Sequence, residues 1–168
     1  MTRFLLPFFL LFVLASCGLR PLYSGGTSGV VANLLRGVTV DRIEGRAGWL
    51  MRNALNDRLD AAGTGETRYR LTVKLDDNIE GFGVRADDTV TRERRTLRAR
   101  YQLIDLATGK TVLDTTAGSD AGIDVVSSEY ATIAAENKAL ENLSREVADQ
   151  IVTRLSIFAN EAQGAATP

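Results

Sequence analysis

The sequence predicts an α+β domain in which two helices pack on one face of a four-stranded sheet. Several stretches alternate apolar and polar residues, which is typical of strands with one covered face. Two other stretches carry apolar residues at helical spacing, and the order along the chain is β-α-β-β-β-α. Because each helix and the sheet have one apolar face, the simplest packing places both helices on the same side of the sheet.

The first predicted strand and helix follow one another closely. Val38–Ile43 alternates and is rich in β-branched residues, which favours a strand. Arg46–Ala62 carries Leu55 and Leu59 at helical spacing, and Gly63 fits the position of a C-terminal cap. If the first strand runs parallel to the next one, this helix is the crossover between them.

Three further strands are predicted in the middle of the chain. Arg68–Asp76 and Thr91–Leu106 both alternate, with apolar residues on one face and charged residues on the other. Residues 105–110 predict a tight turn in which Gly109 takes the positive φ angle, and Thr111–Ala117 forms the last strand. The sheet is therefore expected to be covered on one side.

The register of the long hairpin follows from its two apolar rows. A slip of one residue would turn one row to the wrong face, so only registers that keep both rows together are allowed. A turn centred near Asp87 places Leu71 opposite Leu103 and brings charges of opposite sign together on the other face. A bulge at Gly81 or Gly83 would break this register.

A long helix is predicted to close the domain. Ser127 or Ser128 suits the N-cap, Glu129 suits the first turn, and the helix runs to about Asn160. Residues 161–168 are expected to form a loose tail, so the folded domain spans residues 37–160. The apolar stripe of the helix consists of Ile133, Leu140, Leu143, Val147, Ile151, Leu155 and Phe158.

The first residues predict export and lipidation. Arg3, the apolar stretch Phe4–Leu14 and the small residues before Cys17 follow the order of a secretory signal. Leu14-Ala15-Ser16-Cys17 resembles the lipobox of bacterial lipoproteins, in which the chain is cut before the cysteine and the cysteine is acylated. Residues 1–16 are therefore interpreted as a cleaved signal peptide and Cys17 as the lipid anchor. The alternative is an ordinary signal peptide followed by an incidental buried cysteine.

The segment after the anchor predicts where the protein resides. Residues 17–36 are interpreted as the lipidated cysteine and a flexible spacer, because residues 24–29 read Ser-Gly-Gly-Thr-Ser-Gly. Gly18 replaces the aspartate that resembles an inner-membrane retention signal in enterobacterial lipoproteins. We therefore expect an outer-membrane protein that faces the periplasm.

Composition excludes several functions. The chain has no histidine and one cysteine, which excludes histidine-dependent catalysis, histidine-ligated metals, internal disulfides and multi-cysteine metal sites. A net charge of −1 provides no basic field for nucleic-acid binding. We expect no cofactor and no nucleic-acid partner.

Residues 17–23 suggest a family. They read Cys-Gly-Leu-Arg-Pro-Leu-Tyr, which resembles the start of the LptE lipopolysaccharide-assembly lipoproteins of alphaproteobacteria, although Leu19 departs from the more usual phenylalanine. The resemblance implies a non-enzymatic protein that plugs the outer-membrane β-barrel LptD and helps it assemble. It also implies a role in delivering lipopolysaccharide to the outer leaflet, and binding of that lipid through basic side chains.

The polar face of the sheet offers candidate lipid contacts. Its basic residues could meet the phosphates of a lipid A head group. The alternative is a solvated face whose charges pair across strands, as Asp76 and Arg98 would. The candidate lipopolysaccharide-binding residues are Arg70, Lys74, Arg98 and Arg100.

Two other classes of function remain open in the sequence. The chain could be a general periplasm-facing lipoprotein, an adaptor or binding module with a different partner. An enzyme would have to use paired carboxylates, such as Asp76 with Asp77 or Asp87 with Asp88. Neighbouring residues on a strand point to opposite faces, which is poor geometry for a shared acid–base site.

Overall fold

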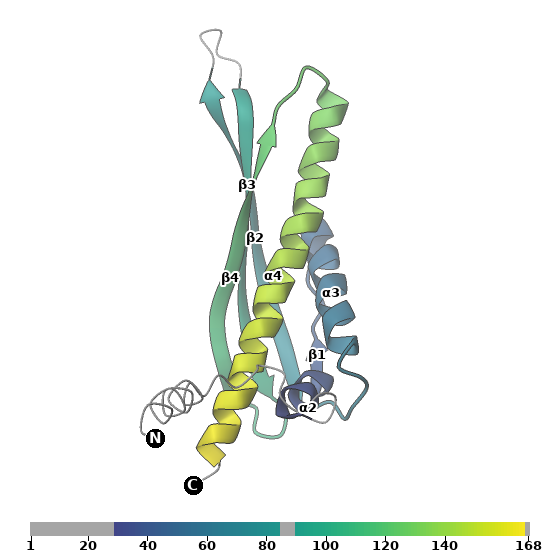
Figure 1. Ribbon diagram of the computed structural model, residues 1–168, viewed down its shortest axis with the longest axis vertical. Helices are drawn as coiled ribbons and strands as arrows, with labels where there is room; N and C mark the ends of the chain where they lie inside the picture. The colour runs from purple at the N-terminus through teal and green to yellow at the C-terminus, as the bar shows by residue number, and fades with distance from the viewer. Residues whose placement is uncertain (1–28, 85–89, 167–168) are drawn as a thin grey trace, which may run out of the picture.

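The computed structural model describes residues 29–84 and 90–166. It is an elongated α+β molecule with its helices packed on one face of a four-stranded sheet, so the predicted fold class is confirmed (Figure 1). No helix in the described part of the chain combines the length and apolar character that a membrane crossing needs. The elements are α2 (Val30–Arg36), β1 (Val38–Val40), α3 (Gly45–Asp60), β2 (Tyr69–Val84), β3 (Val90–Asp105), β4 (Thr111–Asp124) and α4 (Glu129–Ala166).

The sheet follows the predicted topology and register. Its order is β1-β2-β3-β4, with β1 parallel to β2 and the other pairs antiparallel. Leu71 lies opposite Leu103 as predicted, and the same register continues through Gly81 opposite Glu93 without a bulge. The predicted turn residues 86–88 lie outside the described residues.

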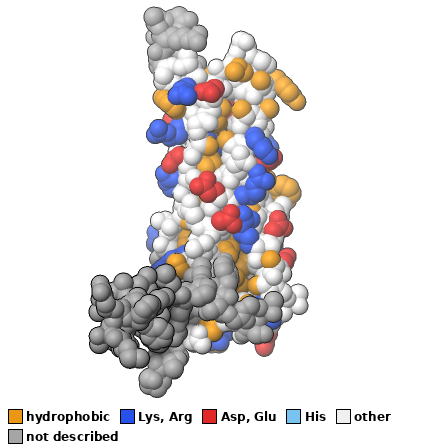
Figure 2. All heavy atoms as spheres, viewed as in Figure 1, with side chains coloured by type: hydrophobic (Ala, Val, Ile, Leu, Met, Phe, Trp, Pro, Cys, Tyr) orange, Lys and Arg blue, Asp and Glu red, His pale blue; other side chains and the backbone are white. Residues whose placement is uncertain are grey.

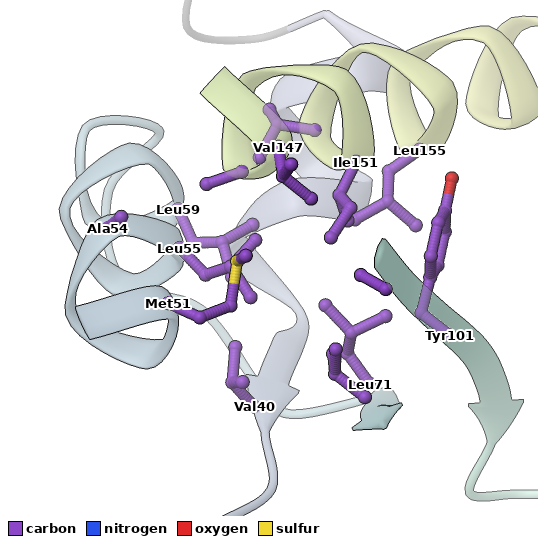
Figure 3. Packing of buried hydrophobic residues seen from close by; sticks show 14 of the residues in the cluster. Val40, Met51, Ala54, Leu55, Leu59, Leu71, Tyr101, Val147, Ile151 and Leu155 are labelled. Carbon is purple, nitrogen blue, oxygen red and sulfur yellow. The ribbon is translucent and has the colours of Figure 1, made fainter. Parts of the chain in front are cut away.

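The core lies between the inner face of the sheet and the three helices. Figure 3 shows Met51 and Leu55 of α3 and Ile151 of α4 directed toward Leu71 and Tyr101 of the sheet. All five side chains are at most 1% exposed. The alternation along β2 and β3 and the apolar stripes of α3 and α4 therefore meet in one continuous apolar cluster.

Two local signals at the element ends, Ser128 and Gly109, are confirmed, whereas α3 ends at Asp60 with Ala61 as its C-cap, two residues before the predicted Gly63. Ser128 caps α4, because the backbone N–H of Ala131 donates to its Oγ at 3.4 Å. Gly63 follows α3 with φ 96° and donates its N–H to the carbonyl of Asp60 at 2.9 Å. Gly109 takes φ 68° in the turn between β3 and β4.

The predicted spacer and tail are too long where they meet the domain. Residues 30–36, assigned to the spacer over 17–36, form α2 and bury Val31, Leu34 and Leu35 in the core. Residues 161–166, assigned to the loose tail, continue α4. Alanine is the strongest helix former, which favours continuation through this alanine-rich end.

Two strand ends also differ from the prediction. β1 ends at Val40 rather than Ile43, and β4 continues to Asp124 rather than stopping near Ala117. Gly118 and Gly122 have low strand propensity, but both pair with β3, which supplies the ladder that the local sequence does not favour.

An ion pair extends the inner face beyond the apolar row. The guanidinium of Arg95 donates to both carboxylate oxygens of Asp77, at 2.8 and 2.6 Å, and to the backbone carbonyl of Glu136 at 2.8 Å. Arg95 is 9% exposed, and the paired carboxylate and the carbonyl satisfy its charge and donors. The pair therefore ties β2 and β3 to the first half of α4.

Truncation of Leu103 tests this core. We expect Leu103→Ala to lower the free energy of unfolding by about 2–5 kcal/mol, because the fully buried side chain leaves a cavity. Leu106→Ala makes the same chemical change at a side chain that is 39% exposed and should cost less than about 1 kcal/mol. Denaturant unfolding of the two variants checks the difference, and equal losses would contradict the packing.

Candidate functional site

The candidate basic residues all lie on the face of the sheet that points away from the helices. Lys74 of β2 lies directly opposite Arg100 of β3, and Arg98 lies opposite Asp76. Arg70 lies at the β1 end of the same face, opposite Ile104. The structure therefore groups Lys74, Arg98 and Arg100. Arg70 lies on the same face but is separated from Lys74 by Thr72 along β2. We call this surface the outer face.

Three of these four cations have a carboxylate partner. Arg98 pairs with Asp120 at 3.1 Å and Arg100 with Asp114 at 3.1 Å, both across to β4. Arg70 lies 3.7 Å from Asp41, which follows β1. The alternative of a face with cross-strand pairs is thus realised for these residues.

Arg98 does not use the partner that the hairpin register suggests. Asp76 lies opposite Arg98, yet the guanidinium turns the other way and donates to both carboxylate oxygens of Asp120, at 3.2 and 3.1 Å. Gly118 lies opposite Arg98 on β4, and a Cβ there would come within 2.4 Å of the Arg98 Cδ. The missing side chain of Gly118 therefore leaves the space through which Arg98 reaches Asp120.

The paired carboxylates are held in their charged form. Arg100 and Gln102 donate hydrogen bonds to Asp114 and lower its pKa below the ordinary value. Thr96 donates to Asp120 at 2.6 Å and, together with Arg98, lowers the pKa of that carboxyl. Hydrogen bonding to Asp114 in turn raises the pKa of Arg100.

Lys74 is the available cation of this group. It is exposed, and it has no ion pair among the described residues. With Thr72, Arg100 and Gln102 it lines a shallow depression of about 280 Å³ on the outer face. An anion there would meet the ammonium of Lys74 and one edge of the Arg100 guanidinium.

The charges of the molecule are interspersed rather than gathered. Figure 2 shows basic and acidic side chains mixed along the visible face, with apolar side chains at its upper end. The first turns of α4 lie at that end in Figure 1, where Tyr130 is 84% exposed and Ile133 is 47% exposed. On the outer face itself, Asp41, Asp114 and Asp120 lie beside the arginines, so any anion binding there depends on local geometry and not on a field of one sign.

The structure does not support an acid–base site at Asp76 and Asp77. Asp77 points inward to Arg95, whereas Asp76 lies on the outer face opposite Arg98. The two carboxylates therefore cannot act on one substrate atom. Asp87, Asp88 and the predicted anchor Cys17 lie outside the described residues.

Comparison with known protein families shows which family this chain belongs to. A family model described as LptE, lipopolysaccharide-assembly, matches residues 35–155. The chain belongs to this LptE family. The resemblance predicted from residues 17–23 is confirmed by a match that lies entirely outside that motif. A comparison with curated proteins gives no match.

Solved structures share the LptE-type fold. A Caulobacter crescentus protein described as a lipoprotein has a TM-score of 0.64 and 24% identity, covering 80% of this chain and 98% of its own. A minor lipoprotein from Acinetobacter baumannii has 0.60 and 14%, with coverages of 73% and 92%. The rare lipoprotein B from Shewanella oneidensis has 0.60 and 10%, with coverages of 76% and 97%. At these identities the likeness establishes the fold.

Sequence reasoning missed the β4 aspartates that pair with the arginines on the outer face of this LptE-family chain. Asp114 lies in the predicted last strand, but Asp120 lies beyond its predicted end at Ala117. The alternation of Asp114, Thr116, Gly118 and Asp120 at every second position was the available signal. Reading it requires the strand to continue through glycines, which the propensity of the local sequence disfavours.

The Asp114 pKa tests the outer-face pairing. Arg100→Gln should raise the pKa of Asp114 toward its ordinary value, because the Arg100 hydrogen bond that lowers this pKa most is lost. Lys74→Gln removes the same charge from the same face without touching Asp114 and should change this pKa less. Carboxyl NMR titration measures both.

The same shifts determine how stability changes in acid. A carboxyl whose pKa is lowered in the folded state stabilises the protein above the unfolded pKa, and this contribution is lost as the pH falls through the lowered value. In Arg100→Gln, the pKa of Asp114 is closer to its unfolded value. The free energy of unfolding of this variant should therefore fall less steeply than that of the parent protein as the pH is lowered. An unchanged Asp114 pKa in that variant would contradict the pairing.

Proposed function

We propose that this protein is a lipid-anchored outer-membrane lipoprotein that partners the β-barrel LptD and assists both barrel assembly and delivery of lipopolysaccharide. The observation that carries the proposal is the match of the LptE lipopolysaccharide-assembly family over residues 35–155. The structures that share the fold come from proteins described as lipoproteins, which is consistent with this role.

Cys17 is the proposed anchor. The tetrad that ends at this residue resembles a lipobox, and Cys17 is the single cysteine of the chain. A cysteine that carries two or more acyl chains anchors stably, whereas one chain binds a membrane marginally. The described domain begins with α2 at Val30, so the anchor would hold this end of the molecule near the periplasmic surface of the membrane.

The outer face is the proposed contact surface. The helices cover the inner face, so the outer face is the broad side of the sheet left for a partner. Lys74, Arg98 and Arg100 would meet lipid A phosphates there. Arg98 and Arg100 would have to exchange Asp120 and Asp114 for phosphate, whose oxygens can accept the same charge-assisted hydrogen bonds from each guanidinium. Lys74 needs no exchange, because no carboxylate of the described residues pairs with it.

Isolation of the protein from its native membrane tests the proposed partner. The full-length protein, extracted in detergent from the outer membrane of its own host, should co-purify with LptD in stoichiometric amount. Cys17→Ser should lose incorporation of a fatty-acid probe and leave the outer-membrane fraction. A lipidated protein that brings down another periplasmic partner in place of LptD would support the general adaptor lipoprotein instead.

Lipid contact at the outer face can be tested by removing its cations in one variant and its carboxylates in another. Replacing Lys74, Arg98 and Arg100 with Ala should weaken lipopolysaccharide binding by about tenfold at low ionic strength and leave folding nearly intact. The double variant Asp114→Asn and Asp120→Asn should strengthen binding, because both guanidinium groups lose their competing carboxylates.

A matched variant separates the effect of the outer-face residues on binding from the effect of the change in net charge. Replacing Arg42, Arg46 and Arg52 with Ala removes the same number of charges from α3 and the segment before it. That variant should bind lipopolysaccharide like the parent protein in a titration followed at increasing salt. If the outer-face and α3 variants lose equal affinity, the outer face has no specific role.

A further inference from the structure

β2 has an open hydrogen-bonding edge over much of its length. β1 pairs with Tyr69–Leu71, whereas β2 continues to Val84. Beyond Leu71, β3 lies on one side of β2 and no strand of the described chain lies on the other. Figure 1 shows β2 and β3 extending well past the upper end of α3. We call residues 75–81 the β2 edge.

The direction of the backbone groups at this edge follows from one hydrogen bond. The carbonyl of Leu71 accepts from the N–H of Asp41 at 3.0 Å, so the backbone of Leu71 faces the β1 side. Backbone groups alternate in direction along a strand, so those of Leu75, Asp77, Ile79 and Gly81 face the same side. The intervening residues pair with β3.

On the opposite edge of the sheet, a side chain of α4 occupies the backbone of Gly118 in the middle of β4. Gln150 of α4 accepts from the N–H of Gly118 at 3.2 Å and donates to its carbonyl at 3.3 Å. One side chain therefore occupies both backbone groups in the middle of β4. Within residues 29–84 and 90–166, no side chain bonds to the backbone of the β2 edge in the same way. Proteins generally protect exposed edges because such edges template pairing with another strand.

Side chains along the β2 edge define what would fit beside it. On the inner face, Ile79 is 38% exposed and Leu75 is partly buried, so a neighbouring apolar residue would cover both. On the outer face, Asp76 and Glu80 have no ion pair within the described residues, so neighbouring cations would neutralise them. A fitting strand alternates apolar and basic residues.

The same charges disfavour a second copy of this chain. Two antiparallel β2 edges centred on Asn78 would place Asp76 opposite Glu80 of the other copy. A parallel pair in register would place each carboxylate beside its own equivalent. Like charges directly opposite each other destabilise a strand pair.

We propose that the β2 edge accepts an extended segment of another polypeptide by strand addition, with apolar residues toward the helices and Lys or Arg toward the outer face. Main-chain hydrogen bonds to the open edge supply affinity, and the alternating side chains supply specificity. The inference concerns a surface other than the basic group of the outer face and does not depend on the proposed function.

Amide hydrogen exchange of the full-length protein in detergent tests the edge before any ligand is added. The amides of Leu75, Asp77, Ile79 and Gly81 should exchange quickly, whereas those of Asp76, Asn78 and Glu80 should exchange slowly because they bond to β3. A short peptide that alternates valine and lysine then serves as the probe. Its binding should slow exchange at the first set of amides.

Two variants of one residue isolate the backbone contribution. Ile79→Ala removes the side chain and keeps the edge N–H, whereas Ile79→Pro also removes that N–H and leaves the ladder to β3 in place. Ile79→Pro should bind the valine–lysine peptide at least about fivefold more weakly than Ile79→Ala, which corresponds to one lost hydrogen bond. Asp76→Asn with Glu80→Gln should weaken binding at low salt.

Peptide controls keep the test decisive if the proline variant fails to fold. A fully N-methylated copy of the peptide and a valine–glutamate peptide should both leave the edge amides unprotected. Equal protection by either control would overturn the proposal, as would peptide binding that protects no edge amide. Protection that grows with protein concentration in the absence of peptide would assign the edge to a second copy and also overturn it.

Discussion

The continuous, in-register pairing of β2 with β3 is the constraint on which the rest of the structure depends. Because the pairing carries no bulge from Tyr69 to Val84, every second residue stays on the same face along the whole hairpin. That regularity produces an unbroken inner row for α3 and α4, and an outer face of charges. A single inserted residue would exchange the two faces beyond it, and the core and the outer face would be lost together.

Charge on the outer face is balanced locally, and this shapes its proposed chemistry. Aspartates on β4 hold Arg98 and Arg100, so the proposed lipid phosphate would have to compete with carboxylates that are already well placed. Competition weakens resting affinity but also makes binding reversible, because a departing anion is replaced at once. Lys74 has no such partner in the described part of the chain and is suited to a first contact. In the proposed role of passing lipid onward, this arrangement would serve better than a permanently bare basic patch.

The sequence was sufficient for the pairing of β2 with β3, because alternation in Arg68–Asp76 and Thr91–Leu106 is long enough to specify both faces and their register. It was insufficient for α2, whose apolar residues occur at helical spacing but over a single short stretch. A helix of this length depends on packing against the rest of the domain. The pairing of Arg98 with Asp120 could not be predicted from the sequence either. It depends on the length of β4, on the β3–β4 register shift near Leu103, and on the absence of a side chain at Gly118.

Gly118 also links two surfaces that differ in chemistry. Its bare Cα lets Arg98 lie across β4 toward Asp120, while its backbone N–H and carbonyl receive Gln150 at the sheet edge. A methyl group at this position would displace Arg98 from Asp120 and break that ion pair without altering any ionisable residue, while Thr96 would still donate to the Asp120 carboxylate. The electrostatic character of the outer face is thus under steric control, and a substitution between uncharged residues there would act as a charge mutation.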